Sequence, residues 1–430
     1  MGAYGNLVNP AAGFDYRPRV ADAELAARLA ATGAVVIDGP RGCGKTETAR
    51  QAASSEVRLD VDDEARAAGL LAPALLLEGD PPRLIDEWQL VPAIWNQVRR
   101  EVDATGGRPG QFILTGSAVP ADDVTRHSGA LRFSRLRMRP MSLAESGHST
   151  GDISLEALLD GAEPRAVDPG LTINDLAERV TVGGWPNLQD RTIDEALIAL
   201  RGYLEETRRV DLVRVDGIGR DPENVARVLR SLARNVATGA SARAIAADVG
   251  GAEGPIDHHT VLSYLAALSR LFVVEDLPAW SPALRSRTIL RGAPTRHFVD
   301  PSLAVAALGA RPDRLLRDVE TLGFLFESLV VRDLRIYAQA LDASVFHYRD
   351  STDLEADAIV ERRDGIWAAF EAKLGQGAID RAAESLLRLA SRVDPEKHGP
   401  PVALAVITGW GYGYRRPDGV AVIPIGALAP

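Results

Sequence analysis

A glycine-rich segment near the N-terminus has the spacing of a phosphate-binding loop. Gly39 and Gly44 bracket it, and a lysine and a hydroxyl follow, in the order GPRGCGKT. Glycines let main-chain N–H groups turn toward phosphate oxygens, and a helix N-terminus behind the loop favours negative charge. Lys45 would reach the β- and γ-phosphates, and Thr46 would ligate Mg²⁺. The segment therefore predicts an ATP and Mg²⁺ site made by Gly39, Pro40, Arg41, Gly42, Cys43, Gly44, Lys45 and Thr46.

An acidic pair ends a second apolar run, and two hydroxyls end a third. The run Arg83–Glu87 (RLIDE) delivers Asp86 and Glu87 at its C-terminal end, where open α/β sheets bind ligands. We expect Asp86 to hold Mg²⁺ and Glu87 to polarise the attacking water. The third run brings either Thr115 or Ser117 between the γ-phosphate and that water. A surface turn and an ordinary strand end are the competing interpretations.

An arginine cluster follows the third run and is a candidate source of an arginine finger, for a neighbouring subunit if the chain assembles. We assign the finger to Arg132, which makes a homo-oligomer a candidate assembly. A solvated basic face is the competing interpretation. The full cluster is Arg126, Arg132, Arg135, Arg137 and Arg139.

With these motifs, residues 16–145 resemble the AAA-14 type ATPase domain. The matching segments are Arg17-Pro18-Arg19, the GPRGCGKT loop, LIDEWQ, LTGSA and RPMSLAE. The region after them is similar to the associated DUF4143 domain, whose GG-aromatic-Pro signature corresponds to Gly183-Gly184-Trp185-Pro186. The resemblance implies ATP hydrolysis and a P-loop core of the additional-strand, catalytic-glutamate class. One departure is Gly129-Ala130-Leu131-Arg132, where a Gly-Arg step is usual, and this bears on the finger assignment.

The order of elements predicts three modules. Residues 1–150 alternate short apolar runs with helical segments, which predicts an α/β domain with a parallel sheet. Residues 151–310 begin with a Gly-, Ser-, Asp- and Pro-rich stretch (147–169) that reads as a linker, and they continue as helices. Residues 311–430 return to mixed α and β character.

The middle module has the order of a winged helix-turn-helix. Three predicted helices (225–235, 241–248 and 257–269) precede two predicted strands (271–276 and 296–299). The third helix would present His258, His259, Ser263 and Tyr264, and a basic stretch with Arg285, Arg287 and Arg291 would act as the wing. Packing between domains is the competing interpretation, because the third helix carries no Arg or Lys before Arg270. We assign no metal to the histidines.

The C-terminal module resembles the PD-(D/E)xK nuclease core, an α/β restriction-endonuclease-like fold. Glu327 lies in a helical run, Asp357 in a strand, and Glu371 and Lys373 follow as E-x-K on the next strand. Asp357 and Glu371 would share Mg²⁺, and Glu327 would join them. Lys373 would face the same side as Glu371, because strand side chains alternate, and it would orient the attacking water. A degenerate, inactive domain is the competing interpretation.

Composition limits the other classes of protein. The chain has 430 residues, 46% of them hydrophobic, and a single cysteine, Cys43, which excludes a disulfide framework and is expected to be a small apolar filler. No apolar run is long enough for a membrane span, and residues 1–20 lack signal-peptide character, so we expect a cytoplasmic protein without a membrane partner. The net charge of −10 leaves any DNA contact to local basic patches.

Together these patterns predict an ATP-hydrolysing protein that couples nucleotide state to action on DNA, with Mg²⁺-dependent DNA cleavage as a further step. The alternative is an ATP-dependent switch that binds protein or DNA and whose nuclease-like domain is inactive.

Overall fold

The computed structural model describes residues 16–117, 128–250, 256–281, 293–350, 352 and 354–430. The chain separates into two compact units, Met1–Met138 and Arg139–Pro430. The module boundaries expected near residues 150 and 310 both fall inside the second unit.

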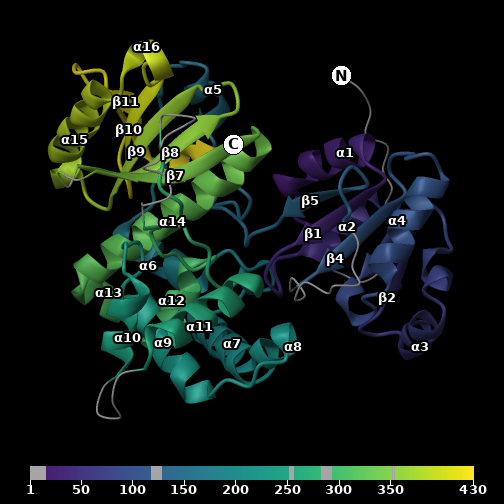
Figure 1. Ribbon diagram of the computed structural model, residues 1–430. Coiled ribbons are helices and arrows are strands. Elements are labelled where there is room, and N and C mark those ends of the chain that lie inside the picture. The colour runs from purple at the N-terminus through teal and green to yellow at the C-terminus, as the bar shows by residue number, and fades with distance from the viewer. Residues whose placement is uncertain (1–15, 118–127, 251–255, 282–292, 351, 353) are drawn as a thin grey trace. The chain divides into compact units, whose positions relative to one another are not determined.

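The first unit is built on a parallel five-stranded sheet (Figure 1). Its strands are β1 Ala34–Asp38, β2 Ser55–Arg58, β3 Arg83–Asp86, β4 Phe112–Gly116 and β5 Phe133–Arg137. They are ordered β2-β3-β4-β1-β5, and every neighbouring pair is parallel. The predicted parallel α/β core is confirmed, and β4 is an additional strand between the strand before the glycine-rich loop and the strand of the acidic pair.

Both faces of this sheet are covered, because the strands alternate apolar side chains between two cores. Val35 and Ile37 enter one core with α1 and α2, while Ala34 and Val36 enter the other with α4. The helices are α1 Ala21–Ala31, α2 Lys45–Ala52, α3 Asp63–Leu71 and α4 Ile94–Ala104, with 3-10 turns at Pro73–Leu77 and Trp88–Leu90. Strand β1 is buried along its whole length, which fixes the start of the loop that follows it.

The second unit begins with a helical part. Its helices are α5 Leu155–Leu159, α6 Ile173–Val182, α7 Ile193–Glu206, α8 Leu212–Asp216, α9 Pro222–Arg234, α10 Ala242–Gly250, α11 His258–Arg270, α12 Pro301–Leu308 and α13 Pro312–Arg317. Ser241 and Asp257 cap α10 and α11 as predicted, because their side chains accept hydrogen bonds from the N–H groups of Ala244 (3.1 Å) and His259 (2.9 Å). The helix boundaries predicted from apolar spacing therefore agree closely with the structure.

The two strands predicted after α11 are reduced to isolated bridges. Residues 271–276 and 296–299 meet through single antiparallel pairs rather than a continuous ladder. Thr238, between α9 and α10, bridges Arg296 in the same way. The stretch predicted as a wing (Arg285, Arg287 and Arg291) lies outside the described residues.

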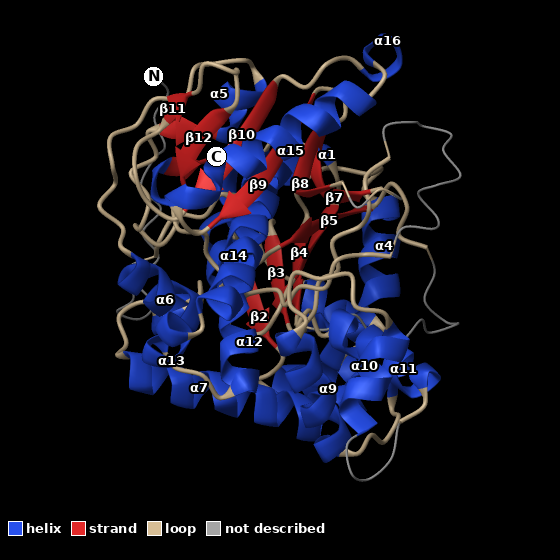
Figure 2. Cartoon of the chain, turned by 90° about the vertical axis from the view of Figure 1, so that its left-hand side faces the viewer, coloured by secondary structure: helices blue, strands red, loops and turns tan. Residues whose placement is uncertain are grey.

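The last part of the chain is a long helix and a mixed six-stranded sheet (Figure 2). After α14 Val319–Ala340 come β7 Ala343–Arg349, β8 Glu355–Arg362, β9 Trp367–Lys373, α15 Ile379–Arg392, α16 Pro395–His398, β10 Ala403–Thr408, β11 Tyr414–Arg415, β12 Ala421–Pro424 and β13 Leu428–Ala429. The sheet is ordered β11-β12-β10-β9-β8-β7. Strands β7, β8 and β9 are antiparallel neighbours, whereas β10 is parallel to β9 and β12. Helices α14 and α15 pack against this sheet.

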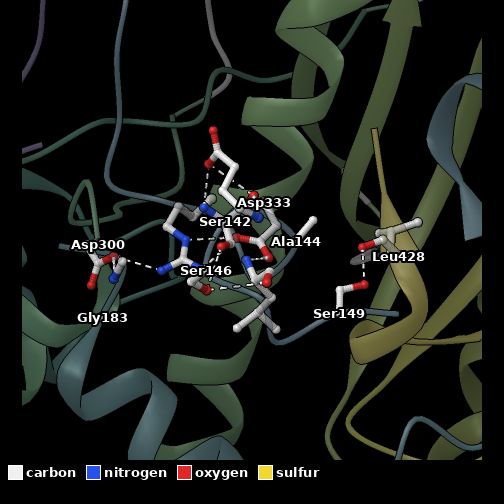
Figure 3. Close-up of polar contacts among 12 residues, drawn as sticks. Ser142, Ala144, Ser146, Ser149, Gly183, Asp300, Asp333 and Leu428 are labelled. Atoms are coloured by element: carbon white, nitrogen blue, oxygen red, sulfur yellow. Dashed lines mark hydrogen bonds and ion pairs between the residues drawn. The ribbon is translucent and has the colours of Figure 1, made fainter. Parts of the chain in front are cut away.

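The stretch predicted as a linker is docked onto the C-terminal sheet region. Strand β6, Ile153–Ser154, pairs with β13, and Ala166 bridges Gly413. The side chain of Ser149 donates to the carbonyl of Leu428 at 2.8 Å (Figure 3). These contacts pack the stretch 147–169 against the last part of the chain, so it is not a free connection.

A buried polar cluster fixes the RPMSLAE segment within the second unit (Figure 3). Arg332 of α14 forms ion pairs with Asp300 (2.8 Å) and Asp333 (2.7 Å), and all three are buried. Asp333 then accepts from the N–H of Leu143 at 3.0 Å, and Asp300 accepts from the N–H of Gly184 at 2.9 Å. These contacts give the GG-aromatic-Pro signature and the RPMSLAE segment a shared structural role.

Along the described ranges, no helix is both long enough and apolar enough to cross a bilayer.

Candidate functional site

The glycine-rich loop connects β1 to α2 with the predicted geometry. Gly42 and Gly44 have φ of 75° and 101°, in the left-handed region that favours glycine. A Cβ on Gly39 would lie 2.4 Å from the carbonyl oxygen of Met138, so only glycine fits there. The buried Lys45 ammonium donates to the carbonyl of Pro40 at 2.8 Å, which holds it across the loop. Cys43 is fully buried in the core, in agreement with its expected role as a filler.

Asp86 lies at the centre of the site. Its Oδ1 accepts a hydrogen bond from the Thr46 hydroxyl at 2.9 Å and another from the Thr115 hydroxyl. The parallel register places Asp86 beside Thr115, so this meeting follows from the sheet order. Arg58 adds an ion pair at 3.9 Å to the other oxygen. A carboxylate and a hydroxyl at the phosphate loop are hard oxygen ligands, which fit the preferences of Mg²⁺.

Glu87 is held in an unusual backbone conformation next to Asp86. Its φ of 54° is in the left-handed region, which is uncommon for a residue with a side chain and is found often at functional positions. The carboxylate accepts from the amide of Gln89 and from the Ser117 hydroxyl at 3.2 Å. Gln89 belongs to the LIDEWQ segment, but its spacing alone does not reveal this contact.

The two hydroxyls at the end of β4 have different contacts. Thr115 is buried and bound to Asp86, whereas Ser117 contacts Glu87 and accepts from the Arg41 guanidinium at 3.5 Å. Of the two alternatives, Ser117 therefore lies beside the acid expected to activate water, and Thr115 supports the acid expected to hold the metal.

A further acid, Asp38, ends β1 just before the loop. Its carboxylate pairs with Arg135 of β5 at 2.5 Å, and Arg135 lies over the ring of Trp95. Burial raises the pKa of Asp38, and the nearby Arg135 opposes that rise. The sequence gives no signal for this pair, since it depends on the pairing of β1 with β5.

Arg132 lies at the end of the strands opposite to the loop. Its carbonyl accepts from the N–H of Ala34 at the start of β1, while the loop follows the end of β1. Four strand steps separate these ends, about 13 Å. Arg132 pairs with Asp103 at 2.7 Å. It is therefore placed away from the loop of its own chain.

The other arginines of the cluster have different surroundings. Arg139 belongs to the second unit, where it pairs with Glu275 at 2.7 Å and donates to Gln339 at 2.6 Å. Arg126 lies outside the described residues.

A second site brings together three of the four predicted residues of the C-terminal module. Lys373 lies 2.6 Å from Glu371 and 3.2 Å from Asp357. Asp357 also accepts from the N–H of Ala372 at 2.7 Å, which ties β8 to β9. Glu371 and Lys373 thus face the same side, as strand alternation predicts. Burial lowers the pKa of Lys373, but the two carboxylates outweigh it and raise that pKa.

Glu327 of α14 lies near this group but does not complete a compact ligand set. Burial and then Asp357 raise the pKa of Glu327 well above its usual range, and the same causes raise the pKa of Glu371 to about 8. Carboxylates that repel one another in a buried place favour a bound cation. However, among the described residues the one group of three acids or histidines with ligand atoms within 4.8 Å of each other is Asp257, His258 and His259.

Sequence profiles of known families match three parts of the chain. Residues 31–147 match the profile described as "AAA domain". Residues 31–147 are thus similar to an AAA domain. Residues 322–428 match "Domain of unknown function (DUF4143)", and residues 173–314 match "Domain of unknown function (DUF8612)". The predicted AAA-14 and DUF4143 resemblances are confirmed. The DUF4143 match begins at residue 322, however, and Gly183-Gly184-Trp185-Pro186 lies in the DUF8612 match, so the assignment of this signature to the start of DUF4143 is wrong.

Two solved structures show distant likeness. The Walker-type ATPase of Pyrococcus abyssi is 14% identical, with 68% of this chain and 99% of that chain covered and a TM-score of 0.41. A substituted RuvB of Thermotoga maritima is 15% identical, with 60% and 88% covered and a TM-score of 0.26. No curated protein sequence matches the chain. The fold assignment of the AAA domain rests on its strand order and its profile match.

Outside the AAA domain, α11 does not present the residues expected of a DNA-reading helix. Tyr264 is buried, and the Arg220 guanidinium lies 5.9 Å from its ring centroid, so the prediction that Tyr264 faces outward is wrong. Arg220 also donates to Ser263 at 3.3 Å. The packing of α11 against the segment around residue 220 takes these side chains inward. His258 and His259 remain at the helix start.

Proposed function

We propose that the AAA domain binds Mg²⁺–ATP and hydrolyses it. The observation that carries this proposal is Asp86, which receives both the Thr46 and the Thr115 hydroxyls beside the phosphate loop. Backbone N–H groups of residues 39–44 would bind phosphate oxygens, and Lys45 would exchange its contact with Pro40 for the β- and γ-phosphates. Thr46 and Asp86 would hold Mg²⁺, which neutralises phosphate charge when bound.

Glu87 is the proposed general base for the attacking water. Its carboxylate is oriented by Gln89 and Ser117, so the side chain is fixed while it accepts a proton. Arg41, next to Ser117, is suited to the developing charge on the γ-phosphate. Thr115 supports this arrangement through Asp86 rather than by contact with water.

Steady-state ATP turnover and nucleotide binding test this function. Glu87→Gln is expected to lower turnover by roughly 100-fold or more and to retain ATP, because one proton acceptor is lost and the loop is intact. Lys45→Ala is expected to weaken ATP binding itself. Lys397→Ala, at an exposed ion pair with Asp394, is the matched control. Wild-type turnover in Glu87→Gln would remove Glu87 from catalysis, and absence of ATP binding by the wild type would reject the function.

We further propose a three-module organisation, with boundaries near residues 1–150, 151–310 and 311–430. Support for a winged-helix module comes from the order α9, α10, α11 followed by the bridged segments 271–276 and 296–299. Support for a PD-(D/E)xK-like module comes from the order α14, β7, β8, β9, α15, β10, with β10 parallel to β9. Nucleotide state would then govern an action of the later modules on DNA.

Within the third module, Asp357 and Glu371 are the proposed Mg²⁺ ligands. Lys373, which contacts both, would orient or help deprotonate the water that attacks a phosphodiester. Glu327 would adjust the charge of the group from α14. DNA is the proposed partner.

A switch without nuclease activity is the second candidate, and a specific observation favours it. Among the described residues, the ligand atoms of Glu327, Asp357 and Glu371 do not all lie within 4.8 Å of one another. Lys373 already forms ion pairs with both strand acids, which places its charge where a metal ion would bind. A domain that binds DNA or protein without cutting is consistent with this arrangement.

Degradation of linear and circular DNA, with Mg²⁺ and with or without ATP, separates the two candidates. For a nuclease, Lys373→Ala is expected to abolish cleavage and leave ATP turnover intact, and Lys45→Ala would show whether nucleotide controls cleavage. No cleavage by the wild type, with ATP turnover intact, would establish the switch instead. Lys397→Ala again serves as the lysine control.

Arg132 can serve as a finger only for a neighbouring chain, given its distance from its own loop. We propose a homo-oligomer with this contact. Sedimentation with ATP should then show a larger species, and an inactive Lys45→Ala chain mixed with an Arg132→Ala chain should recover turnover. If the protein sediments as a monomer in the presence of ATP and still shows full ATP turnover, the proposed assembly is rejected.

A further inference from the structure

The RPR segment before α1 contacts the phosphate loop through Arg19. Arg19 is buried, with 8% of its surface exposed. Its Nη1 donates to the main-chain carbonyl of Cys43 at 2.7 Å, and the bond is buried. The proposed ATPase function assigns no task to this arginine, although Arg17-Pro18-Arg19 belongs to the sequence pattern of the domain.

The contacted carbonyl belongs to the peptide that leads into the last glycine of the loop. In a planar trans peptide the C=O and the following N–H point in opposite directions. With the Cys43 carbonyl directed at Arg19, the N–H of Gly44 is directed away from Arg19. Gly44 has φ of 101°, and glycine moves readily between backbone conformations, so this peptide needs an external contact to hold its orientation.

The same segment also braces the helix behind the loop. The Tyr16 hydroxyl donates to Asp22 at 2.5 Å and lies 3.0 Å from the Thr48 hydroxyl of α2. Asp22 accepts from the N–H of Arg19 at 2.8 Å, which fixes the main chain that carries the guanidinium. Tyr16 and Arg19 therefore hold α2 and the loop from one short segment.

We propose that Arg19 is a positioning residue that orients the Cys43–Gly44 peptide so that the Gly44 N–H is available to a nucleotide phosphate. This inference rests on the proposed ATP binding by the loop. Burial of a guanidinium is unfavourable unless its donors are used, and an apolar side chain would fill the same space without that cost. The contribution specific to arginine is its N–H donor at the Cys43 carbonyl.

Three variants test the role. Arg19→Met keeps the length and removes the donors, and Arg19→Lys keeps one charged donor. Arg28→Met is the control, because Arg28 lies in the neighbouring helix α1 and forms an ion pair with Glu24. The dissociation constant of Mg²⁺–ADP is measured with a fluorescent analogue, and thermal unfolding is followed for each variant. The Gly44 amide resonance is followed by NMR on glycine-labelled protein during ADP addition.

Arg19→Met is expected to weaken ADP binding roughly 10- to 100-fold, the value of a hydrogen bond to a charged group. Its Gly44 resonance should lose the shift that ADP produces in the wild type. Arg19→Lys should recover part of both, while Arg28→Met should match the wild type. If Arg19→Met does not fold, the Arg19→Lys variant alone tests the positioning role. It should then show weaker ADP binding than the wild type and a smaller Gly44 shift on ADP addition.

Two outcomes overturn the inference and are distinguishable. Wild-type ADP affinity and Gly44 shift in a folded Arg19 variant, even one of lower melting temperature, would make Arg19 only a structural contact. Absence of ADP and ATP binding by the wild type itself would instead reject the proposed function, and the inference with it.

Discussion

At the scale of single residues, the loop site depends on hydroxyls that orient carboxylates. Thr115→Val removes one of the two hydroxyl bonds to Asp86 and preserves the side-chain shape. We expect a loss of stability of roughly 1–3 kcal/mol, because a buried carboxylate loses a partner. We also expect a higher Mg²⁺ requirement for ATP turnover, because Asp86 is then less firmly oriented.

Titration of turnover with Mg²⁺ and urea unfolding measure these two effects. Thr105→Val is a suitable control, because the Thr105 hydroxyl donates to the carbonyls of Glu101 and Val102 near the end of α4. An unchanged Mg²⁺ requirement in Thr115→Val would show that the contacts of Asp86 with Thr46 and Arg58 are sufficient to orient it.

A buried histidine gives the second unit a pH dependence. Burial lowers the pKa of His297 well below 6.5, and the nearby Arg335 and His347 lower it further. Glu275 opposes this change, because its charge favours the protonated imidazole. The folded state therefore holds a neutral imidazole, whereas the unfolded chain binds a proton as the pH falls below 6.5. The unfolding free energy should decrease from about pH 7 to about pH 5, by up to about 1.4 kcal/mol per pH unit.

His297→Phe removes this titration, so the pH slope of its unfolding free energy should be smaller by up to one proton. The variant also loses the contact of Nδ1 with the Ser328 hydroxyl, which lowers stability equally at all pH values. His259→Phe, at an exposed position, is the control. An identical slope for wild type and His297→Phe would mean that other groups set the pH dependence.

At the scale of elements, two adjacent glycines hold the RPMSLAE segment in place. A Cβ on Gly184 would lie 2.0 Å from the carbonyl oxygen of Met141, and one on Gly183 would lie 2.3 Å from Asp300. Gly184→Ala therefore has to displace main chain that is bonded to the buried cluster. We expect a loss of roughly 3 kcal/mol or more, in the range of severe core changes.

Chemical denaturation of the full chain measures this loss. Gly202→Ala in α7 is the matched control, since a Cβ there meets nothing within 4 Å. Alanine is favoured over glycine inside a helix by about 0.5–1 kcal/mol, so the control should be slightly stabilised. Equal effects of the two substitutions would contradict a role for Gly184 in close packing.

The elements also show which features local sequence can specify. Strands β1 and β3 are predicted with their observed ends, because each is a short apolar run followed by residues of the site. Strand β5 is not predicted, because its alternating arginines resemble a basic surface and only its pairing with β1 makes it a strand. The contacts of Asp86 with Thr115 and of Arg19 with Cys43 depend on tertiary structure, so no spacing rule finds them.

At the scale of the whole molecule, the two compact units should respond separately to ligand. The phosphate loop lies in Met1–Met138, and the buried ion cluster of Arg332 lies in Arg139–Pro430. A ligand stabilises the part of a protein that binds it, by about 2.7 kcal/mol at 100 times its dissociation constant. We therefore expect two calorimetric transitions, of which Mg²⁺–ADP raises one by roughly 5–10 °C.

Variants assign each transition to its unit. Lys45→Ala should abolish the shift produced by Mg²⁺–ADP, because the loop loses its principal cation. Gly184→Ala should lower the other transition and leave the nucleotide-dependent shift intact, because its contacts lie wholly in the second unit. A single transition that both substitutions move would instead mean that the two units unfold together. Nucleotide binding at the loop would then also stabilise the second unit, including the buried ion cluster of Arg332.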